Sequence, residues 1–206
     1  MPADATPRRA SLATADEGRL NSLALGVLME HVGDRRDCCV LDLGPGFGAN
    51  VEFLSRFAKR IVIEDFYRTL AEIAEPFTGD DRLYCPVYET LLPYGGQNPF
   101  DVILLWDLLD YLDRDDIRRL ARHLQRLCHR GSLIVAMIST QHKIPLIPAN
   151  FKIVGQDGLS RESTTTAQRD CPRHSQVRLL ELMPGFRVKR SFLLRGGMQE
   201  YLLGPA

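Results

Sequence analysis

The sequence predicts a doubly wound α/β domain with a mainly parallel, seven-stranded sheet that ends in an antiparallel C-terminal hairpin. Short apolar runs alternate with amphipathic helical segments, which is typical of a parallel sheet with helical crossovers. A glycine-rich turn follows the first apolar run. The last two runs are joined only by Arg195-Gly196-Gly197, and so short a link indicates a hairpin.

Seven apolar runs are the expected strands, and the third is the weakest of them. In chain order they are 38–43, 60–63, 82–85, 100–106, 132–138, 186–194 and 198–203. Helical spacing predicts helices from about Asp16 to a stop at Gly33, and over 51–58, 70–74, 113–130 and 177–182. Residues 1–14 predict a flexible tail ahead of a single domain over 15–206.

The polar stretch from Thr140 to His174 interrupts this alternation. It contains an Asp157-Gly158 turn signal and a single aromatic residue, Phe151. In a compact domain, a loop of this length is a lid, a binding loop or a disordered segment. We expect the part from about Gln141 onward to shape or cover a pocket.

Composition and charge limit the kinds of binding partner that we expect for this protein. Lys plus Arg and Asp plus Glu both number 26, so no overall basic field favours nucleic acid. No apolar run is long enough to span a bilayer, and the start of the chain lacks a signal-peptide core, so we expect a cytoplasmic protein. The five cysteines are scattered and read as free thiols. Cys171 and His174 lack a second pair with zinc-ligand spacing, so no metal is expected.

The turn after the first strand reads Asp42-Leu43-Gly44-Pro45-Gly46-Phe47-Gly48. Glycines at this spacing let a ligand approach the backbone because no side chain intervenes. The next strand ends at Glu64-Asp65, where a carboxylate can accept hydrogen bonds from both hydroxyls of a ribose. We favour Glu64, which directly follows the apolar run. The alternatives are a tight turn that needs glycine for its backbone angles and a solvated acidic strand end.

These residues resemble the class I S-adenosylmethionine-dependent methyltransferases, whose first motif is an acidic residue followed by Gly-x-Gly-x-Gly. The segment from Val40 to Gly48 matches every defining position, and the resemblance extends from about Asp16 to Leu203, hairpin included. It implies a Rossmann-like sheet, S-adenosylmethionine as cofactor, and in-line methyl transfer. It also implies that Trp106 and Asp107, after the fourth strand, line the cofactor and substrate pocket.

The chain departs from this family after the third strand. The family often has an acidic residue there that accepts a hydrogen bond from the adenine amino group. Tyr88 stands near that position here and Glu89 follows it, so the resemblance makes both of them candidate cofactor contacts.

The acceptor and the catalytic groups are less well marked. His142, just beyond the fifth strand, and Asp107 are the candidates for a general base. Motifs of enzymes that methylate exocyclic amines or cytosine carbon are absent after the fourth strand, which leaves a small molecule as the expected substrate. The sequence carries no signal of oligomeric state.

The sequence is also compatible with two other functions. The segment from Gly44 to Ala49 also satisfies Gly-x-Gly-x-x-Ala, a form of the dinucleotide fingerprint of oxidoreductases. Asp42 argues against that class, because dehydrogenases have an apolar or small residue there. The fold can also serve as a non-catalytic scaffold or cofactor-binding partner, since a fold does not dictate function.

Overall fold

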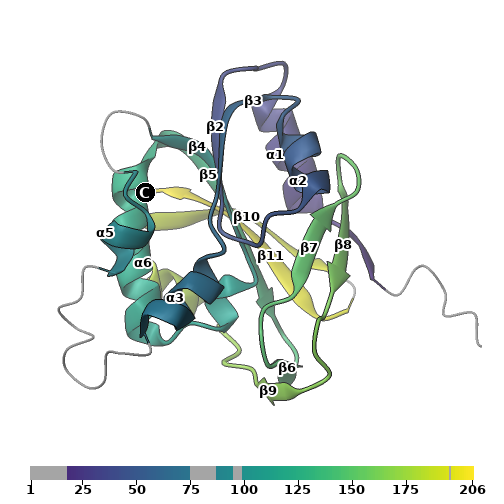
Figure 1. The fold of residues 1–206 in the computed structure, drawn as a ribbon, viewed down its shortest axis with the longest axis vertical. Coiled ribbons are helices and arrows are strands. Elements are labelled where there is room, and N and C mark those ends of the chain that lie inside the picture. The colour runs from purple at the N-terminus through teal and green to yellow at the C-terminus, as the bar shows by residue number, and fades with distance from the viewer. Residues whose placement is uncertain (1–17, 75–86, 95–98, 195) are drawn as a thin grey trace, which may run out of the picture.

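The computed structural model describes residues 18–74, 87–94, 99–194 and 196–206, and its centre is a six-stranded sheet (Figure 1). The strands lie in the order β10-β11-β5-β4-β2-β3. Their bounds are β2 Cys38–Asp42, β3 Ala58–Ile63, β4 Phe100–Trp106, β5 Cys128–Ser139, β10 Phe186–Leu194 and β11 Met198–Pro205. Strands β3, β2, β4 and β5 pair in parallel, whereas β11 is antiparallel to both of its neighbours.

The predicted α/β class is therefore confirmed, with β10 and β11 as antiparallel neighbours. The predicted count of seven strands is not reached among the described residues. The expected third strand, 82–85, lies outside them.

Helices cover both faces of the sheet (Figure 1). One face carries α1 (Leu23–Val32) and α2 (Gly48–Leu54), which join the buried cluster around Val40 and Leu104. The other face carries the remaining helices: α3 Phe66–Ala74, α5 Val87–Leu91, α6 Arg114–Leu127 and α7 Gln176–Leu182. The short 3₁₀ helix η1, Leu108–Asp110, follows β4 directly.

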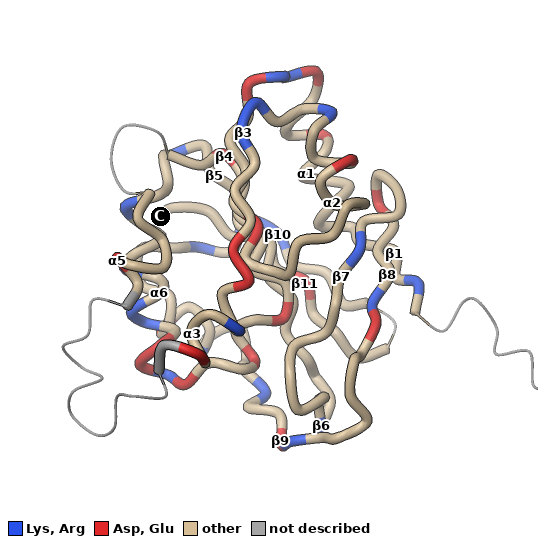
Figure 2. Tube along the Cα trace, in the orientation of Figure 1, with Lys and Arg blue, Asp and Glu red and all other residues tan. Residues whose placement is uncertain are grey.

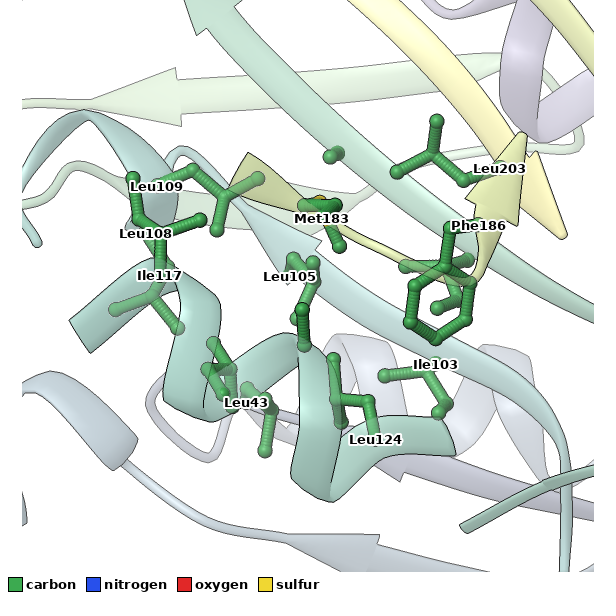
Figure 3. Close-up of a cluster of buried hydrophobic side chains, with 14 of the residues drawn as sticks. Leu43, Ile103, Leu105, Leu108, Leu109, Ile117, Leu124, Met183, Phe186 and Leu203 are labelled. Carbon is green, nitrogen blue, oxygen red and sulfur yellow. The ribbon is translucent and has the colours of Figure 1, made fainter. Parts of the chain in front are cut away.

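The larger cluster of buried side chains joins α6 to the sheet (Figure 3). Leu124 of α6 points toward Ile103 and Leu105 of β4, and Ile117 of α6 and Phe186 of β10 pack into the same cluster. All five side chains are almost fully buried. Burial of this apolar area, at about 25 cal/mol per Å², fixes α6 on the sheet.

Helix α6 is shorter than predicted. Asp113 caps it by accepting hydrogen bonds from the backbone N–H groups of Asp115 and Asp116 at 2.9 and 2.8 Å. The expected helix ran to Arg130, but β5 begins at Cys128, which pairs with Phe100 of β4. Sheet pairing replaces the last helical turn because it satisfies these backbone groups against β4.

The first expected helix also begins later than predicted. Residues Arg19–Asn21 form strand β1, which pairs antiparallel with β8 (Gly158–Glu162). Ser22 then caps α1 by accepting a hydrogen bond from Leu25 N at 3.0 Å. The cap ends the extended segment and sets the first residue of the helix.

The polar stretch of residues 140–174 forms two small antiparallel sheets rather than one loop. Strand β7 (Asn150–Ile153) pairs with β8, and β6 (Lys143–Pro145) pairs with β9 (Gln168–Asp170). Strands β7 and β8 lie beside α2 in Figure 1. Strands β7 and β8 thus form a folded layer over the α1–α2 face of the sheet.

Ionic contacts hold the amino-terminal ends of the central strands together. Asp101, near the start of β4, accepts hydrogen bonds from Cys39 N at 2.7 Å and from an Arg35 Nη at 2.8 Å. His129 Nε2 lies 3.3 Å from the same carboxylate. The β2–β4–β5 segment of the sheet is therefore joined at this end by one side chain.

Charge is spread over the chain rather than gathered into one basic face. Lys and Arg alternate with Asp and Glu along the described trace (Figure 2). Among the described helices, none combines the length and the apolar character needed to cross a bilayer.

Candidate functional site

A cavity of about 350 Å³ opens at the carboxyl ends of the central strands. Its walls are residues 43–45 after β2, 105–108 at the end of β4, and 147–150, which lead into β7. Asp65 and one side of α3, including Tyr67, complete the lining. This volume falls within the usual range for small-molecule sites, and the carboxyl edge of a parallel sheet is where such sites form.

The three glycines of the turn meet different surroundings. A Cβ added at Gly44 would lie 2.6 Å from Cδ1 of Trp106, so the indole ring occupies the space that glycine leaves. A Cβ at Gly46 would meet only Ile63, at 3.6 Å. No atom lies within 4 Å of a Cβ at Gly48, the first residue of α2. The Trp106 ring thus occupies the space beside Gly44, whereas the space beside Gly48 is open.

The neighbours of these glycines take different parts in the site. Pro45 lines the cavity beside Gly44. Phe47 precedes α2, and the ammonium of Lys152 from β7 lies 5.3 Å from the centre of its ring. Phe47 itself is not part of the cavity lining.

Trp106 connects the glycine turn to the folded layer above it. Its Nε1 donates a hydrogen bond to Asp42 Oδ1 at 2.6 Å. Its ring stacks on Phe151 of β7, with 5.4 Å between centroids and 5° between planes. Its φ of 50° lies in the left-handed region, which costs a bulky residue about 1 to 3 kcal/mol. Several contacts therefore hold this residue in an unfavourable backbone conformation.

Asp42 is fully buried under the turn. Its Oδ1 also accepts a hydrogen bond from Gly44 N at 3.0 Å, while Oδ2 has no partner among the described residues. Burial raises the pKa of Asp42 to about 6, and the hydrogen bond from Trp106 opposes that rise. Oδ1 of the Asp42 carboxylate thus accepts hydrogen bonds from two neutral donors, whereas Oδ2 accepts none from the described residues.

The two acidic residues after β3 are placed differently. Glu64 Oε1 accepts a hydrogen bond from Thr69 Oγ1 of α3 at 3.0 Å, and Glu64 is not part of the cavity lining. Asp65 lines the cavity, directly before α3 begins. The geometry therefore brings Asp65, rather than the favoured Glu64, to the cavity wall.

Tyr88 and Glu89 lie on α5, away from the cavity lining. The Tyr88 ring packs against Phe66 of α3, and its hydroxyl donates to Asp116 Oδ1 of α6 at 3.0 Å. Glu89 is exposed and forms an ion pair with Arg126. The structure does not bring these two residues together with the glycine turn.

Asp107 is the candidate base that the structure places in the cavity lining. Its Oδ2 accepts a hydrogen bond from Ala149 N at 3.2 Å, while Oδ1 has no partner within the described part of the chain. Burial raises the pKa of Asp107 to about 6, although that hydrogen bond and the charge of Arg161 oppose the rise. A carboxyl group with a pKa near 6 can accept a proton at neutral pH.

His142, the other candidate base, is exposed just before β6. Its Nδ1 lies 3.5 Å from an Arg173 Nη, and it does not line the cavity. It directly precedes the short pair of strands β6 and β9, and neither strand contributes to the cavity wall.

Asn50 is a positioning residue that sequence reasoning missed. It is buried in α2, donates from Nδ2 to the carbonyl oxygen of Phe151 at 3.0 Å and accepts from Ile153 N at 2.8 Å. A polar residue just after the glycine motif was the available signal. Its partners on β7 lie a hundred residues further along the chain and left no trace in the local pattern.

A metal site has no support in the residues described. No group of three or more His, Cys, Asp or Glu side chains in that part of the chain is arranged to hold an ion.

Residues 41–136 match the family model described as a methyltransferase domain. The matched span begins in β2 and ends in β5, so it holds the glycine turn, α3 and Asp107. The match confirms the resemblance that the glycine turn predicted. No curated protein matches the chain.

Solved structures share the fold at low sequence identity. An S-adenosylmethionine-dependent methyltransferase from Clostridium acetobutylicum ATCC 824 has a TM-score of 0.54 and 13% identity, over 89% of this chain and 90% of that one. A Pyrococcus horikoshii OT3 protein has a TM-score of 0.50 and 14% identity, with coverage of 87% and 86%. The glycopeptide N-methyltransferase MtfA in complex with S-adenosyl-L-methionine has a TM-score of 0.50 and 13% identity, covering 97% and 100%. These likenesses establish the α/β methyltransferase fold.

Proposed function

We propose that this chain is an S-adenosylmethionine-dependent methyltransferase that acts on a small and largely apolar molecule held beside Asp107; its residues 41–136 match a methyltransferase domain. The observation that carries this proposal is that Gly44, Asp65 and Asp107 line the same cavity. The start of the glycine turn and the candidate base thus face the same open cavity, as a cofactor and its acceptor require.

The residues of the site fit this cofactor in two respects. The turn is open at Gly46 and Gly48, and the buried Asp42 has an oxygen without a partner in the described chain. We propose that Asp42 and the turn residues hold the amino-acid end, and that Asp65, or Glu64 behind it, holds the ribose. The turn residues meant here are Gly44, Pro45, Gly46, Phe47 and Gly48.

The chemistry asks little of the protein beyond alignment. When bound, the cofactor supplies a methyl group already activated on a sulfonium sulfur. The bond from sulfur to that carbon breaks as the acceptor's lone pair forms the new bond, and sulfur keeps the electron pair. In-line geometry therefore matters most, and the cavity walls provide it by orienting the acceptor.

Asp107 is the proposed general base. A protonated acceptor must lose its proton during or after transfer, and the unpartnered Oδ1 of Asp107 is the available base. The rest of the wall is mainly apolar, with Leu105, Leu108, Ile147 and Pro148. This lining favours an acceptor with one polar reacting atom on an apolar body.

Binding of S-adenosylhomocysteine, measured by calorimetry with NADH as the comparison ligand, tests the cofactor. We expect S-adenosylhomocysteine alone to bind, with little dependence on salt because it has no phosphates. Tight binding of NADH, or a steep salt dependence, would contradict the proposal.

A transfer assay then tests the acceptor. Methyl transfer from labelled cofactor to a panel of small amines, phenols and heterocycles should identify a substrate. Cofactor binding without transfer to any small molecule, peptide or protein offered would instead support a non-catalytic scaffold.

A further inference from the structure

We propose that the Trp106 side chain is a gate: it occupies the amino-acid end of the cofactor site and must leave Asp42 before a ligand can bind there against Gly44. The inference rests on the proposed function and adds a conformational step to it. It is drawn from the contacts of one residue, which the methyltransferase domain match does not describe.

The indole covers Gly44, the buried first glycine of the turn, whereas Gly46 and Gly48 are exposed. A Cβ on Gly44 would lie 2.6 Å from Cδ1 and 2.8 Å from Nε1 of Trp106, so the ring rests directly on the Gly44 backbone. In the proposed site, that face of the turn is the one a ligand must approach. The ring and a ligand therefore cannot share it.

The indole also uses the hydrogen-bonding capacity of Asp42. Its Nε1 donates to Asp42 Oδ1 at 2.6 Å, which is a short contact to a fully buried carboxyl group. The indole N–H is neutral, so it leaves the charge of this carboxylate without a counterion. A ligand with an ammonium group can replace the indole N–H and supply that counterion, which favours exchange.

The closed position depends on the layer above the sheet. Phe151 of β7 stacks flat on the indole, and Asn50 of α2 holds the Phe151 carbonyl oxygen at 3.0 Å. The hydrogen bond from Nε1 to Asp42 holds the other edge of the ring, so the closed position rests on one stack and one hydrogen bond.

Trp106 is the chain's single tryptophan, so its own fluorescence reports the gate. In the protein without ligand, Gly44→Ala should push the indole off the turn and shift its emission to longer wavelength. Gly48→Ala is the matched control, because no atom lies within 4 Å of the added Cβ, and its emission should equal that of the wild type. Equal emission from both variants would overturn the proposal.

Ligand binding gives the second test, which also serves if Gly44→Ala does not fold. Wild type, Phe151→Leu and the control Ile153→Val, a buried change on the same strand, are titrated with S-adenosylhomocysteine by calorimetry and by tryptophan emission. We expect the ligand to change the emission of the wild type. We expect Phe151→Leu to bind about two- to tenfold more tightly, the effect of losing one aromatic stack from the closed form, and the control to bind as the wild type.

The outcomes separate the gate from the proposed function. Heat of binding with unchanged tryptophan emission, or affinity in Phe151→Leu no higher than in the wild type, would overturn the gate alone. No heat with any of the three proteins would overturn the proposed function, and the gate with it.

Discussion

Asn50 fixes the backbone that follows Phe151, since its amide donates to the carbonyl oxygen of Phe151 and accepts from the N–H of Ile153. One side chain thereby joins α2, the helix that begins at the glycine turn, to strand β7 of the covering layer. Asn50 therefore holds the helix that begins at the glycine turn and strand β7 in a fixed position relative to each other.

Asn50→Ala should therefore lower the free energy of unfolding by about 1 to 3 kcal/mol, because two buried backbone groups lose their partner. Denaturant unfolding measures this change. Glu52→Ala, an exposed change on the same helix, is the control and should have little effect. A loss as small as that of the control would mean that β7 is held without Asn50.

The assignment of the ribose contact is tested by two substitutions. Asp65→Ala should weaken S-adenosylhomocysteine binding by about 1 to 3 kcal/mol, because Asp65 lines the cavity and a ligand hydroxyl would lose a charged acceptor. Glu64→Ala should have a smaller effect, since Glu64 Oε1 already bonds Thr69. Calorimetry gives both affinities, and the reverse ranking would assign the ribose to Glu64.

Asp107→Asn should reduce methyl transfer to a protonated acceptor by about 10²- to 10⁴-fold, the usual contribution of a general base. The amide oxygen can keep the hydrogen bond from Ala149 N, so folding and cofactor affinity should be retained. Single-turnover rates measure the chemical step. A rate equal to that of the wild type would show that solvent takes the proton.

Stability should fall as pH rises through the weakly acidic range. Burial raises the folded-state pKa of Asp42 and Asp107 to about 6 and that of Asp110 to about 7, against an ordinary value of 3.8. Between these values the folded state binds more protons than the unfolded state, so the free energy of unfolding decreases with pH. The charge of Arg161 opposes the rise in pKa at Asp107 and Asp110, and that of Arg169 opposes it at Asp110.

Unfolding measured at several values between about pH 4 and pH 8 tests this sign, since the shifts of Asp42 and Asp107 each correspond to about 3 kcal/mol at most and that of Asp110 to about 4 kcal/mol at most. Asp110→Asn keeps an acceptor for Ser139 N and should flatten the pH dependence. Stability that rises over this range would mean that the carboxylates are better solvated than their burial indicates.

Local pattern was sufficient for the central sheet. The glycine turn after β2, the acidic end of β3 and the C-terminal strands were predicted from short windows of sequence, because each depends on neighbouring residues. The start of β5 was misplaced: helical spacing continues past Cys128, but pairing with β4 takes over there. The strands of residues 140–174 were missed, since three- to five-residue polar strands have no usable periodicity.

The residues that line the cavity were predicted only where they are local to a motif. Gly44 followed from the turn, and Asp107 from its place after β4. The stack of Trp106 on Phe151 joins residues 45 positions apart and depends on how β7 folds back over the sheet. Tyr88 was placed by resemblance, whereas packing against Phe66 directs it into the core.

The contacts of Asp101 give the molecule two ends of opposite character. At one end of the sheet, Arg35, Cys39 and His129 converge on this carboxylate, whereas at the other end Asp42 and Asp107 keep oxygens without partners in the described chain. Natural substitutions at the two ends of the sheet should therefore have different effects. Changes around Asp101 would lower abundance by destabilising the fold, and changes at the opposite edge would alter what the protein recognises while leaving its quantity intact.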